Sequence, residues 1–476
     1  MVVGDIVTGT EVLVIGGGPG GYNAAARLGE AGLEVTLIEA EAVGGVCLNR
    51  GCIPSKALIR AAGAAHTVVT AAQLGIGAHL DGVDLARTMA WKDAIVAKLR
   101  KGVDGLLSHA QVVVVPGTAH FTAADRVSVE NSHGTQSFRF KHCIIATGSR
   151  PSTLPGLAPD GEFVIDSTGA LSLAAVPDEL VVVGGGYIGL ELGTAYAKLG
   201  AKVTVLEYLD RLLPGMDADL ARGVERSLKA LGVKVHTGAK VTGWQRAEGK
   251  ALVTAEVGGK ALQVRADKVL VATGRTPNSA DLALDRAGVE ADARGFIKTD
   301  RQCRTGNPAI FAIGDVAGGP MLAHKASKEA QVVADVLAGK PAAMEPACIP
   351  AVVFTDPEVA TAGLTEAEAR ERGYDPVAMR LPFAALGRAH IFGGTDGFAK
   401  VIADRADGRV LGIHLVGPEV GELAAGAAIA IEMGARVEDL ALTVHPHPTL
   451  SEGVMEGAER LFKQLQVPRQ PAAVHA

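Results

Sequence analysis

The most distinctive chemistry in the sequence is a pair of cysteines five residues apart. Cys47 and Cys52 lie in the stretch GGVCLNRGCIPSK, in which Gly51 stands between them and Pro54 follows. This pattern favours a redox pair in a loop that opens a helix, because a helix N-terminus lowers the pKa of a thiol and supplies the thiolate that disulfide exchange requires. Lys56 adds a positive charge within the first turn of that helix.

Two other interpretations of this pair stay open on spacing alone. A zinc site would need more than two ligands, and no second Cys/His pair follows at the usual spacing, so we expect no metal. Two unpaired buried cysteines are the other alternative. The remaining cysteines stand singly in apolar or loop contexts and are expected to be packing residues; they are Cys143, Cys303 and Cys348.

A candidate acid–base pair lies about 400 residues further along, in the stretch HPHPTLSE. A thiol must lose its proton before it attacks a disulfide, and histidine is the side chain best suited to take a proton near neutral pH. Glu452, five residues after His447, could bind one imidazole nitrogen and fix its tautomer. On sequence alone, however, a loop or capping role is the commoner one for either His445 or His447.

The elements that must position these residues begin with a predicted nucleotide-binding unit. A strand over 12–15, a helix over 20–31 and a strand over 35–38 surround a G-x-G-x-x-G turn, whose glycines are Gly16, Gly18 and Gly21. Such glycines make the tight turn, let the backbone approach a pyrophosphate and let the helix pack on the strand. Glu39, at the end of the second strand, is placed to bind an adenosine ribose.

The same unit occurs a second time, with strands over 180–183 and 203–206. Its glycines repeat the spacing and are Gly184, Gly186 and Gly189. Glu207 follows the first glycine by 23 residues, as Glu39 does in the first unit. A carboxylate at this place repels a 2′-phosphate and accepts a free 2′-hydroxyl, so the second unit favours NAD over NADP.

Together these residues resemble the flavin-dependent pyridine nucleotide-disulfide oxidoreductases over nearly the whole chain. The cysteine stretch is similar to the family's active-site signature. Further matching stretches follow in the family's order; they are Ala146-Thr147-Gly148, Ala272-Thr273-Gly274-Arg275, Ile313-Gly314-Asp315, Leu322-Ala323-His324-Lys325-Ala326 and His445 to Glu452. Within the family, the chain most resembles the branch that oxidises dihydrolipoyl groups.

The resemblance implies a role for each matching residue. Cys47 and Cys52 would form the redox-active disulfide, with Cys47 as the exchange thiol, and His447, supported by Glu452, would be the base for the other subunit's site. Glu191 would pair with Lys56. The residues implied to bind FAD are Gly16, Gly18, Gly21, Glu39, Lys56, Thr147, Gly148, Asp315 and Ala323. Those implied for the NAD unit are Gly184, Gly186, Gly189, Glu191, Glu207 and Gly274.

The implied activity is the oxidation of protein-bound dihydrolipoyl groups through the disulfide and FAD, with reduction of NAD. The implied assembly is a homodimer that serves the lipoyl domains and acyltransferase subunit of a 2-oxoacid dehydrogenase complex, or the glycine cleavage system. Sister enzymes fit less well. Glu207 disfavours the NADPH of a glutathione reductase, no cysteine follows Cys348 as a mercuric reductase would require, and Cys52 is present although a soluble transhydrogenase would lack it. A flavin-bearing binding subunit remains a further alternative.

The expected fold class is α/β, with two Rossmann-like dinucleotide-binding domains and a C-terminal α/β dimerisation domain. The boundaries we predict are 1–148 for the FAD-binding part with the disulfide, 149–273 for the NAD-binding domain, 274–347 for a central part that completes the FAD site, and 348–476 for the interface domain. A β-rich insertion is expected at 119–140, helices at 89–107 and 421–433, and a mobile tail after Val467.

Composition narrows the class of protein further. The 476 residues carry a net charge of −6, which disfavours a dedicated nucleic-acid binder. The longest apolar stretch, 423–431, is much shorter than the ~20 residues of a membrane-spanning helix, so no membrane segment is expected. The N-terminal stretch has no basic head and no long apolar run, and five cysteines are too few for a disulfide scaffold. A cytoplasmic location is therefore expected.

Overall fold

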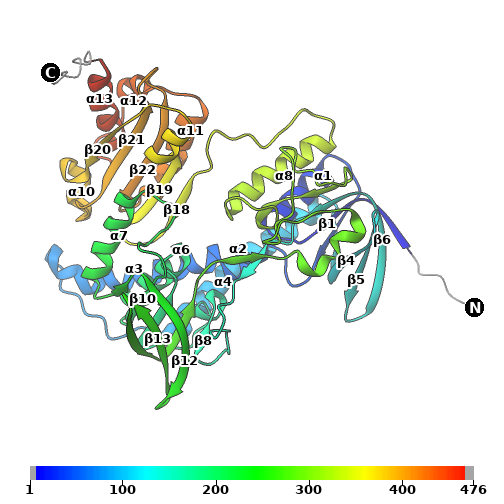
Figure 1. Ribbon diagram of the computed structural model, residues 1–476, viewed down its shortest axis with the longest axis horizontal. Helices are drawn as coiled ribbons and strands as arrows, with labels where there is room; N and C mark the ends of the chain where they lie inside the picture. The colour runs from blue at the N-terminus through cyan, green and yellow to red at the C-terminus, as the bar shows by residue number, and fades with distance from the viewer. Residues whose placement is uncertain (1–6, 467–476) are drawn as a thin grey trace, which may run out of the picture.

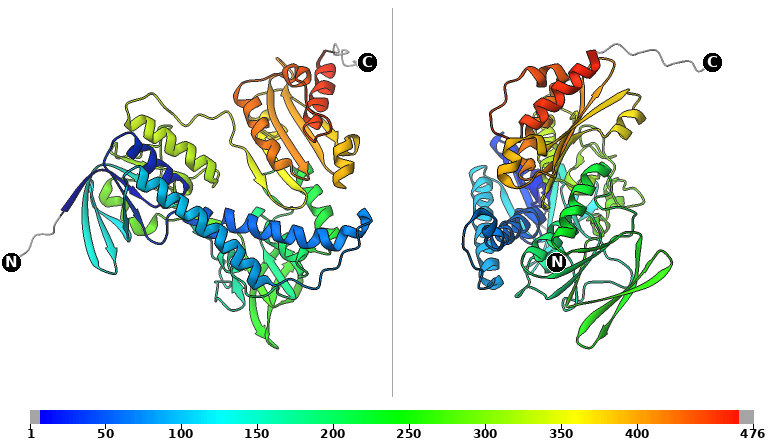
Figure 2. Two further views of the ribbon diagram at one scale, coloured as in Figure 1. Left: turned by 180° about the vertical axis from the view of Figure 1, so that it is seen from behind. Right: turned by 90° about the vertical axis from the view of Figure 1, so that its left-hand side faces the viewer.

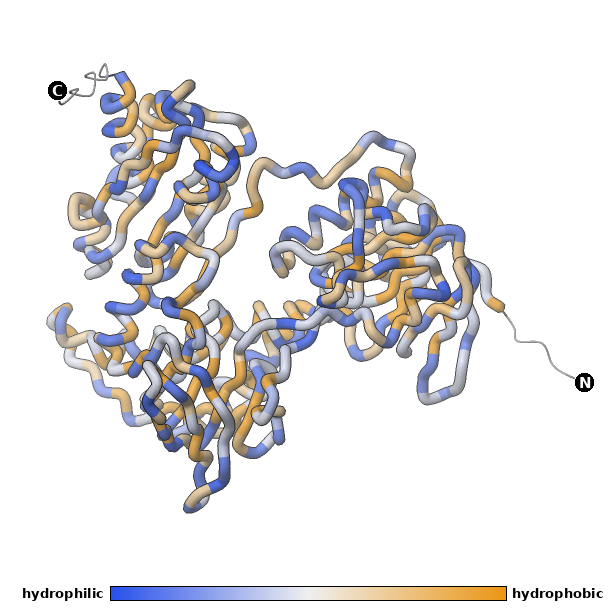
Figure 3. Tube along the Cα trace, viewed as in Figure 1, coloured by the Kyte–Doolittle hydropathy of each residue, from blue (hydrophilic) through white to orange (hydrophobic). Residues whose placement is uncertain are grey.

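The computed structural model describes residues 7–466, which fold into three units, each built around a sheet (Figure 1). The expected mobile tail after Val467 lies outside the described residues. Figure 3 shows that apolar and hydrophilic residues alternate along the trace in all three units.

The first unit is a parallel sheet that the chain leaves and later rejoins. Its parallel strands are β1 (Val7–Ile15), β2 (Val35–Glu39), β3 (Val113–Pro116), the second half of β6 (Gly134–Ile145) and β17 (Ile310–Ala312). The predicted strands at 12–15 and 35–38 are confirmed. Because β17 pairs with β6 only after the second unit has been completed, residues far apart in sequence share one sheet edge.

Helices cover one face of this sheet, and antiparallel strands with short 3₁₀ turns cover the other. α1 (Pro19–Glu30) confirms the helix predicted after the first glycine turn, and it packs beside α8 (Ala323–Leu337). The helix predicted over 89–107 is α4 (Leu85–His109), which begins earlier because the Asp84 carboxylate accepts a hydrogen bond from the Arg87 N–H and caps it. Figure 2 shows α4 and α3 (Cys52–Thr70) running between the first and second units.

The predicted β-rich insertion is present, but it is not separate from the main sheet. β4 (Thr118–Ala123) and β5 (Arg126–Asn131) pair antiparallel with each other, and β5 pairs with the first half of β6. β6 then continues without a break into the parallel sheet. The insertion is therefore an extension of one long strand, which the sequence pattern alone did not indicate.

The second unit repeats the strand–turn–helix arrangement of the first. β9 (Glu179–Val183), α6 (Tyr187–Lys198) and β10 (Lys202–Leu206) confirm the predicted elements, and both strands are parallel. The remaining strands of this parallel sheet are β11 (Lys234–His236), β15 (Lys268–Val271) and β8 (Val164–Ile165). Helix α7 (Ala218–Ala230) follows β10 in sequence. A separate antiparallel sheet consists of β12 (Ala239–Ala247), β13 (Lys250–Val257) and β14 (Lys260–Ala266).

The chain enters and leaves the second unit through one short antiparallel pair. β7 (Ser149–Pro151) and β16 (Arg275–Pro277) are hydrogen-bonded to each other. The two A-T-G stretches of the sequence immediately precede these strands. The two chain segments that connect the units are therefore held together next to residues that were predicted to bind nucleotides.

The third unit is an antiparallel sheet with helices packed against it. Its strands, in spatial order, are β18 (Ala351–Val353), β19 (Glu358–Gly363), β22 (Val410–Gly417), β21 (Phe398–Asp404) and β20 (Pro376–Pro382). The helices are α9 (Glu366–Glu371), α10 (Gly387–Phe392), α11 (Ala424–Glu432), α12 (Val437–Leu442) and α13 (Glu452–Gln466). The single helix expected at 421–433 is wrong at its start, because residues 420–423 form a 3₁₀ turn instead.

Large apolar side chains are exposed on one part of the third unit. Ile429 and Met433, at the end of α11, are 63% and 79% exposed, and Leu442 and Val444 near α12 are 73% and 93% exposed. Exposed large apolar side chains that gather on one unit are typical of a protein–protein contact. No helix within residues 7–466 is long and apolar enough to cross a membrane.

Candidate active site

The cysteine pair forms a disulfide bond between two consecutive helices. Cys47 lies within the short helix α2 (Gly45–Arg50), and Cys52 is the first residue of α3. The expectation that both lie in a loop is therefore wrong for Cys47. A Cβ on Gly51, between the helices, would lie 2.8 Å from the Val46 carbonyl oxygen, so the close approach of α2 and α3 requires glycine there. The alternative of two unpaired cysteines is wrong.

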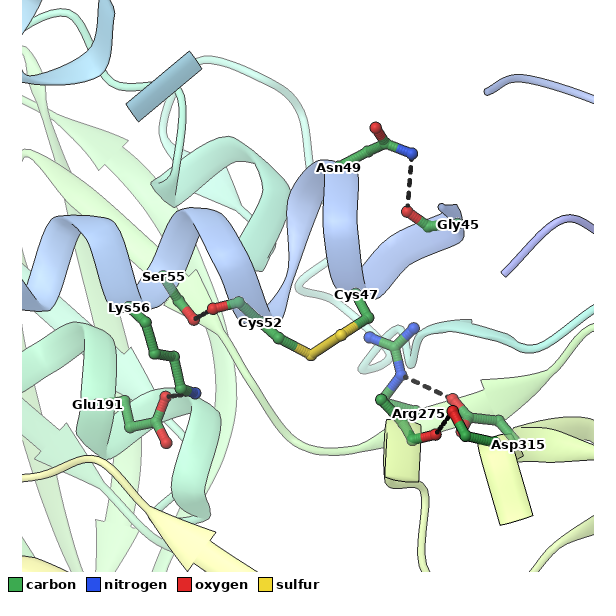
Figure 4. The surroundings of a disulfide bond; sticks show 11 residues. Gly45, Cys47, Asn49, Cys52, Ser55, Lys56, Glu191, Arg275 and Asp315 are labelled. Atoms are coloured by element: carbon green, nitrogen blue, oxygen red, sulfur yellow. Dashed lines mark hydrogen bonds and ion pairs between the residues drawn. A yellow bond between two sulfur atoms is a disulfide. The ribbon is translucent and has the colours of Figure 1, made fainter. Parts of the chain in front are cut away.

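The charged pair predicted beside the disulfide is present (Figure 4). Lys56 Nζ donates to Glu191 Oε2 at 2.7 Å, and the other carboxylate oxygen accepts the Phe354 N–H at 2.9 Å. The Glu191 side chain is 4% exposed and that of Lys56 33%. Glu191 was predicted with the NAD set, but its side chain points toward the disulfide helix. Its contacts place it at the boundary between the two nucleotide units.

A cavity of about 580 Å³ opens beside the disulfide. Both cysteines line it, as do eight of the nine residues predicted to bind FAD: Gly16, Gly18, Glu39, Lys56, Thr147, Gly148, Asp315 and Ala323. The ninth residue, Gly21, does not line the cavity. Of the residues predicted for the NAD unit, Glu191 alone is among those that line this cavity within residues 7–466. The fold thus brings the residues predicted to bind FAD together around the disulfide. It places most of the residues predicted to bind NAD elsewhere.

The glycines of the two turns differ in whether a side chain could be accommodated at their positions. A Cβ on Gly21 would lie 1.7 Å from the Gly16 carbonyl oxygen, and one on Gly189 would lie 2.3 Å from that of Gly184. These third glycines are required by helix–strand packing. A Cβ on Gly18 would meet only the Gly45 Cα at 3.9 Å, and one on Gly186 would meet nothing within 4 Å. The second glycines therefore leave open space at a helix N-terminus, which fits a pyrophosphate.

Glu39 and Glu207 occupy equivalent places in the two units. Glu39 accepts hydrogen bonds from the Gly17 N–H at 2.6 Å and the Glu41 N–H at 2.9 Å. Glu207 accepts from the Gly185 N–H and, at 2.7 Å, from the Leu209 N–H. Each carboxylate thus holds its own glycine turn in place. Each oxygen keeps a further lone pair with which a ribose hydroxyl can be bound.

Asp315 is held at the cavity wall by residues from the link between the units. The Ser149 hydroxyl donates to Asp315 Oδ2, and Arg275 Nε donates to the same hydroxyl oxygen at 2.7 Å. Arg275 Nε also lies 3.8 Å from Asp315 Oδ2. Ser149 was not predicted as a site residue, although it directly follows the first A-T-G stretch, which could have indicated it.

Asn49 is a second site residue that the sequence analysis missed. Its Nδ2 donates to the carbonyl oxygens of Ala42, Val43 and Gly45 at 3.2, 3.0 and 3.0 Å, which ties α2 to the loop after β2. Its Oδ1 is buried without a hydrogen-bond partner among the described residues, and Asn49 lines the cavity. An unpaired buried acceptor beside this cavity fits a hydroxyl donor from a bound nucleotide. Its position between the two cysteines in the sequence could have indicated that Asn49 belongs to the site.

The predicted acid–base pair is formed, but away from the disulfide. His447 Nδ1 lies 2.8 Å from Glu452 Oε1, and Glu452 Oε2 accepts the Thr449 N–H at 2.8 Å. The hydrogen bond from Thr449 and the interaction with His447 lower the pKa of Glu452 below its usual value. His447 is 76% exposed and does not line the cavity that contains Cys47. One chain therefore does not bring its own histidine to its own disulfide.

The other cysteines have the environments expected of packing residues. Cys143 and Cys303 are buried, and Cys348 is partly buried. Burial raises the pKa of Cys303 to about 12 and raises the pKa of Cys143 and Cys348 as well. These thiols stay protonated near neutral pH and are poor nucleophiles.

Two nucleotide-binding units, a disulfide beside the first of them and a third unit with exposed apolar surface define a dinucleotide-dependent disulfide reductase. The chain matches the model of the pyridine nucleotide-disulphide oxidoreductases over residues 10–330 and that of their dimerisation domain over residues 349–458. The chain belongs to this family. The predicted resemblance and fold class are thereby confirmed, and the dimerisation domain supports the predicted homodimer.

The relatives of the chain are consistent with one branch of the family. The dihydrolipoyl dehydrogenase of Halobacterium salinarum is 49% identical over 96% of this chain and 98% of its own length. That of Geobacillus stearothermophilus is 47% identical over 96% and 97%. The crystal structure of LpdA from Mycobacterium tuberculosis has a TM-score of 0.88 at 30% identity, covering 95% of this chain and 99% of that one. The family and these relatives confirm an oxidoreductase with FAD and NAD as cofactors.

Proposed function

We propose that the chain is a homodimeric flavoenzyme that oxidises dihydrolipoyl groups and reduces NAD. The observation that carries this proposal is the Cys47–Cys52 disulfide in the wall of a cavity that also contains the first glycine turn. The relatives at 47–49% identity that bear the name dihydrolipoyl dehydrogenase support the choice of substrate.

The first chemical step is a thiol–disulfide exchange on the cysteine pair. A substrate thiol loses its proton to His447 of the partner subunit, and the resulting thiolate attacks Cys47 Sγ. The Cys47–Cys52 bond breaks, a mixed disulfide forms at Cys47, and Cys52 leaves as the thiolate. The second substrate thiol then attacks the mixed disulfide, closes the oxidised substrate ring and releases Cys47. The substrate loses two electrons, which the cysteine pair gains.

The cavity residues are assigned to hold FAD, and the second glycine turn to hold NAD. FAD would supply the two-electron transfer that connects the reduced cysteine pair to NAD. Gly18 and the N-terminus of α1 leave space for its pyrophosphate, and Glu39 and Asp315 present carboxylates to its hydroxyl groups. Glu207, with no basic residue directly after it, favours the free 2′-hydroxyl of NAD.

His447 and Glu452 are assigned to proton transfer. Glu452 accepts from the Nδ1 side of the imidazole, which leaves Nε2 free to take a proton from a substrate thiol. Because His447 is exposed and distant from the disulfide cavity of its own chain, the proposal requires a second subunit to complete each site.

The biological partners are inferred from the substrate. Lipoyl domains and the acyltransferase subunit of a 2-oxoacid dehydrogenase complex would present such dithiols, as would the glycine cleavage system. A cytoplasmic location agrees with free thiols at Cys143, Cys303 and Cys348.

The test is an initial-rate measurement of NAD reduction by the purified protein with free dihydrolipoamide, with NADP as a parallel acceptor. Fast turnover with NAD and little with NADP is the expected result. A yellow, FAD-loaded protein without turnover would contradict the proposal. It would indicate a different disulfide substrate or a binding subunit.

A further inference from the structure

A buried ion pair stands one layer behind the cavity wall, on the first turns of α8. Lys325 Nζ lies 2.9 Å from Glu329 Oε1, and the two side chains are 6% and 8% exposed. Neither residue lines the cavity, whereas Ala323 and Ala326 of the same helix do. Burying two charges costs free energy unless their remaining hydrogen-bonding groups also find partners. The hydrogen-bond partners of this pair therefore indicate its role.

Both charged groups bind the backbone of Gly314. Glu329 Oε2 accepts the Gly314 N–H at 2.7 Å, and Lys325 Nζ donates to the Gly314 carbonyl oxygen at 3.1 Å. The carboxylate thus meets the positive end of one peptide dipole, and the ammonium meets the negative end of the next. Together they hold the two peptide groups that flank the Gly314 Cα.

The backbone held in this way determines where Asp315 points. Gly314 has a φ of +76°, in the region that favours glycine, and it opens a 3₁₀ turn over residues 314–317. The peptide whose oxygen binds Lys325 is the one that leads directly into Asp315. A rotation of that peptide would move the Asp315 carboxylate relative to the cavity and to Ser149.

We propose that Lys325 and Glu329 are positioning residues that fix Asp315 for binding the sugar-alcohol chain of FAD. This inference rests on the proposed function, which places FAD in the cavity and Asp315 at its hydroxyl groups. The pair acts through the Gly314 backbone and does not contact the cofactor. An ion pair that merely stabilises α8 is the competing explanation, and it would not require bonds to both peptides of one glycine.

The experiment measures the rate at which FAD leaves the purified holoenzyme after dilution, followed by the rise of free-flavin fluorescence. We expect Lys325→Met to release FAD about tenfold faster, since it leaves the Gly314 carbonyl and Glu329 without their donor. Glu329→Gln keeps an acceptor for the Gly314 N–H and should release FAD more slowly than Glu329→Leu. Lys328→Met is the matched control, because Lys328 is an exposed lysine on the same helix, and it should behave as wild type.

A double-mutant cycle separates positioning from general stability. Asp315→Asn removes the carboxylate through which the pair is proposed to act. In that background Lys325→Met should add little, because the two changes affect one interaction. An equal further acceleration in the Asp315→Asn background would overturn the proposal, as would an unchanged FAD release rate in both Lys325→Met and Glu329→Leu.

The same measurements distinguish this inference from the proposed function. A fast release from Asp315→Asn with a normal rate in the Lys325 and Glu329 variants would overturn the positioning role alone. A normal rate in Asp315→Asn itself would overturn the assignment of Asp315 to FAD, and the positioning role would be rejected with it.

Discussion

Lys56 and Glu191 are 135 positions apart in the sequence and join the first two units at an Nζ–Oε2 distance of 2.7 Å. Lys56 belongs to the helix that begins with Cys52, and Glu191 belongs to the helix that follows the second glycine turn. Lys56 also lies over the Phe354 ring, 4.5 Å from its centroid, and Phe354 donates its N–H to Glu191. All three units of the fold therefore meet one turn after the disulfide.

The first prediction concerns this junction. Glu191→Leu should reduce the free energy of unfolding by about 1–3 kcal/mol, because it leaves the Phe354 N–H and the Lys56 ammonium without their acceptor. Urea unfolding measures the change. A cycle with Lys56→Met should show coupling between the two substitutions; strictly additive effects would contradict a direct interaction. Glu225→Leu, on α7 of the same unit, is a control.

The second prediction concerns the disulfide. Cys52→Ser should abolish the oxidation of dihydrolipoamide, since the cysteine pair can no longer accept two electrons. The variant should remain yellow, because the residues assigned to FAD are unchanged. Steady-state rates and the flavin absorbance of the purified protein measure both properties. Cys348→Ser, at a partly buried cysteine outside the cavity, should keep full activity; normal turnover in Cys52→Ser would refute the assigned mechanism.

The third prediction concerns Glu452. Glu452→Gln should lower kcat with dihydrolipoamide by about 10²-fold, the usual scale of a general base whose orientation is lost. Glu459→Gln is the matched control, since Glu459 pairs with Lys463 on the exposed side of the same helix. Equal rates in the two variants would show that Glu452 does not orient His447.

The stability of the same variant should depend on pH in a definite direction. The Thr449 N–H and His447 lower the folded-state pKa of Glu452 below its ordinary value of 4.5. Its stabilising effect is therefore fully present above about pH 4.5 and is lost as the pH falls through the lowered pKa. The difference in unfolding free energy between wild type and Glu452→Gln should be largest near neutral pH and shrink in acid. A difference that grows in acid would contradict this assignment.

The fourth prediction compares two glycines of the NAD turn. Gly186→Ala adds a Cβ that meets nothing within 4 Å, so stability should change by less than about 1 kcal/mol. The same methyl group would enter the space assigned to the pyrophosphate, and the KM for NAD should rise about tenfold. Steady-state kinetics and urea unfolding measure the two effects.

Gly189→Ala provides the contrasting variant. Its Cβ would lie 2.3 Å from the Gly184 carbonyl oxygen, which forces the helix away from the strand. We expect a loss of about 1–3 kcal/mol in the free energy of unfolding. A Gly186→Ala variant with an unchanged KM for NAD would contradict the assignment of this turn to NAD.

Local patterns in the sequence were sufficient to predict the strands, turns and helices of the two nucleotide-binding units. The strands, turns and helices around Gly16 and Gly184 follow from apolar runs and glycine spacing that act over a few residues. The Lys56–Glu191 pair was also anticipated, but only through resemblance, because no local pattern connects residues 135 positions apart.

The rest of the site depends on contacts between distant segments. Asn49 donates to three carbonyl groups within residues 42–45, and Lys325 and Glu329 bind a glycine that precedes them by more than ten residues. Polar residues of these types are usually solvent-exposed, and nothing in their spacing indicates burial. The 3₁₀ turn at 420–423 was similarly hidden, because Ala- and Gly-rich sequence favours no particular start for a helix.

On the proposed mechanism, the separation of His447 from the disulfide of its own chain means that two polypeptides contribute residues to each reaction centre. A subunit that lacks Cys52 can still contribute its histidine to the site of its partner. A subunit that lacks His447 can still contribute its disulfide. A mixed dimer of these two defective chains contains one complete centre, while each pure dimer contains none. Two inactive alleles of this kind would therefore complement each other inside a cell, whereas two alleles that damage the same half would not.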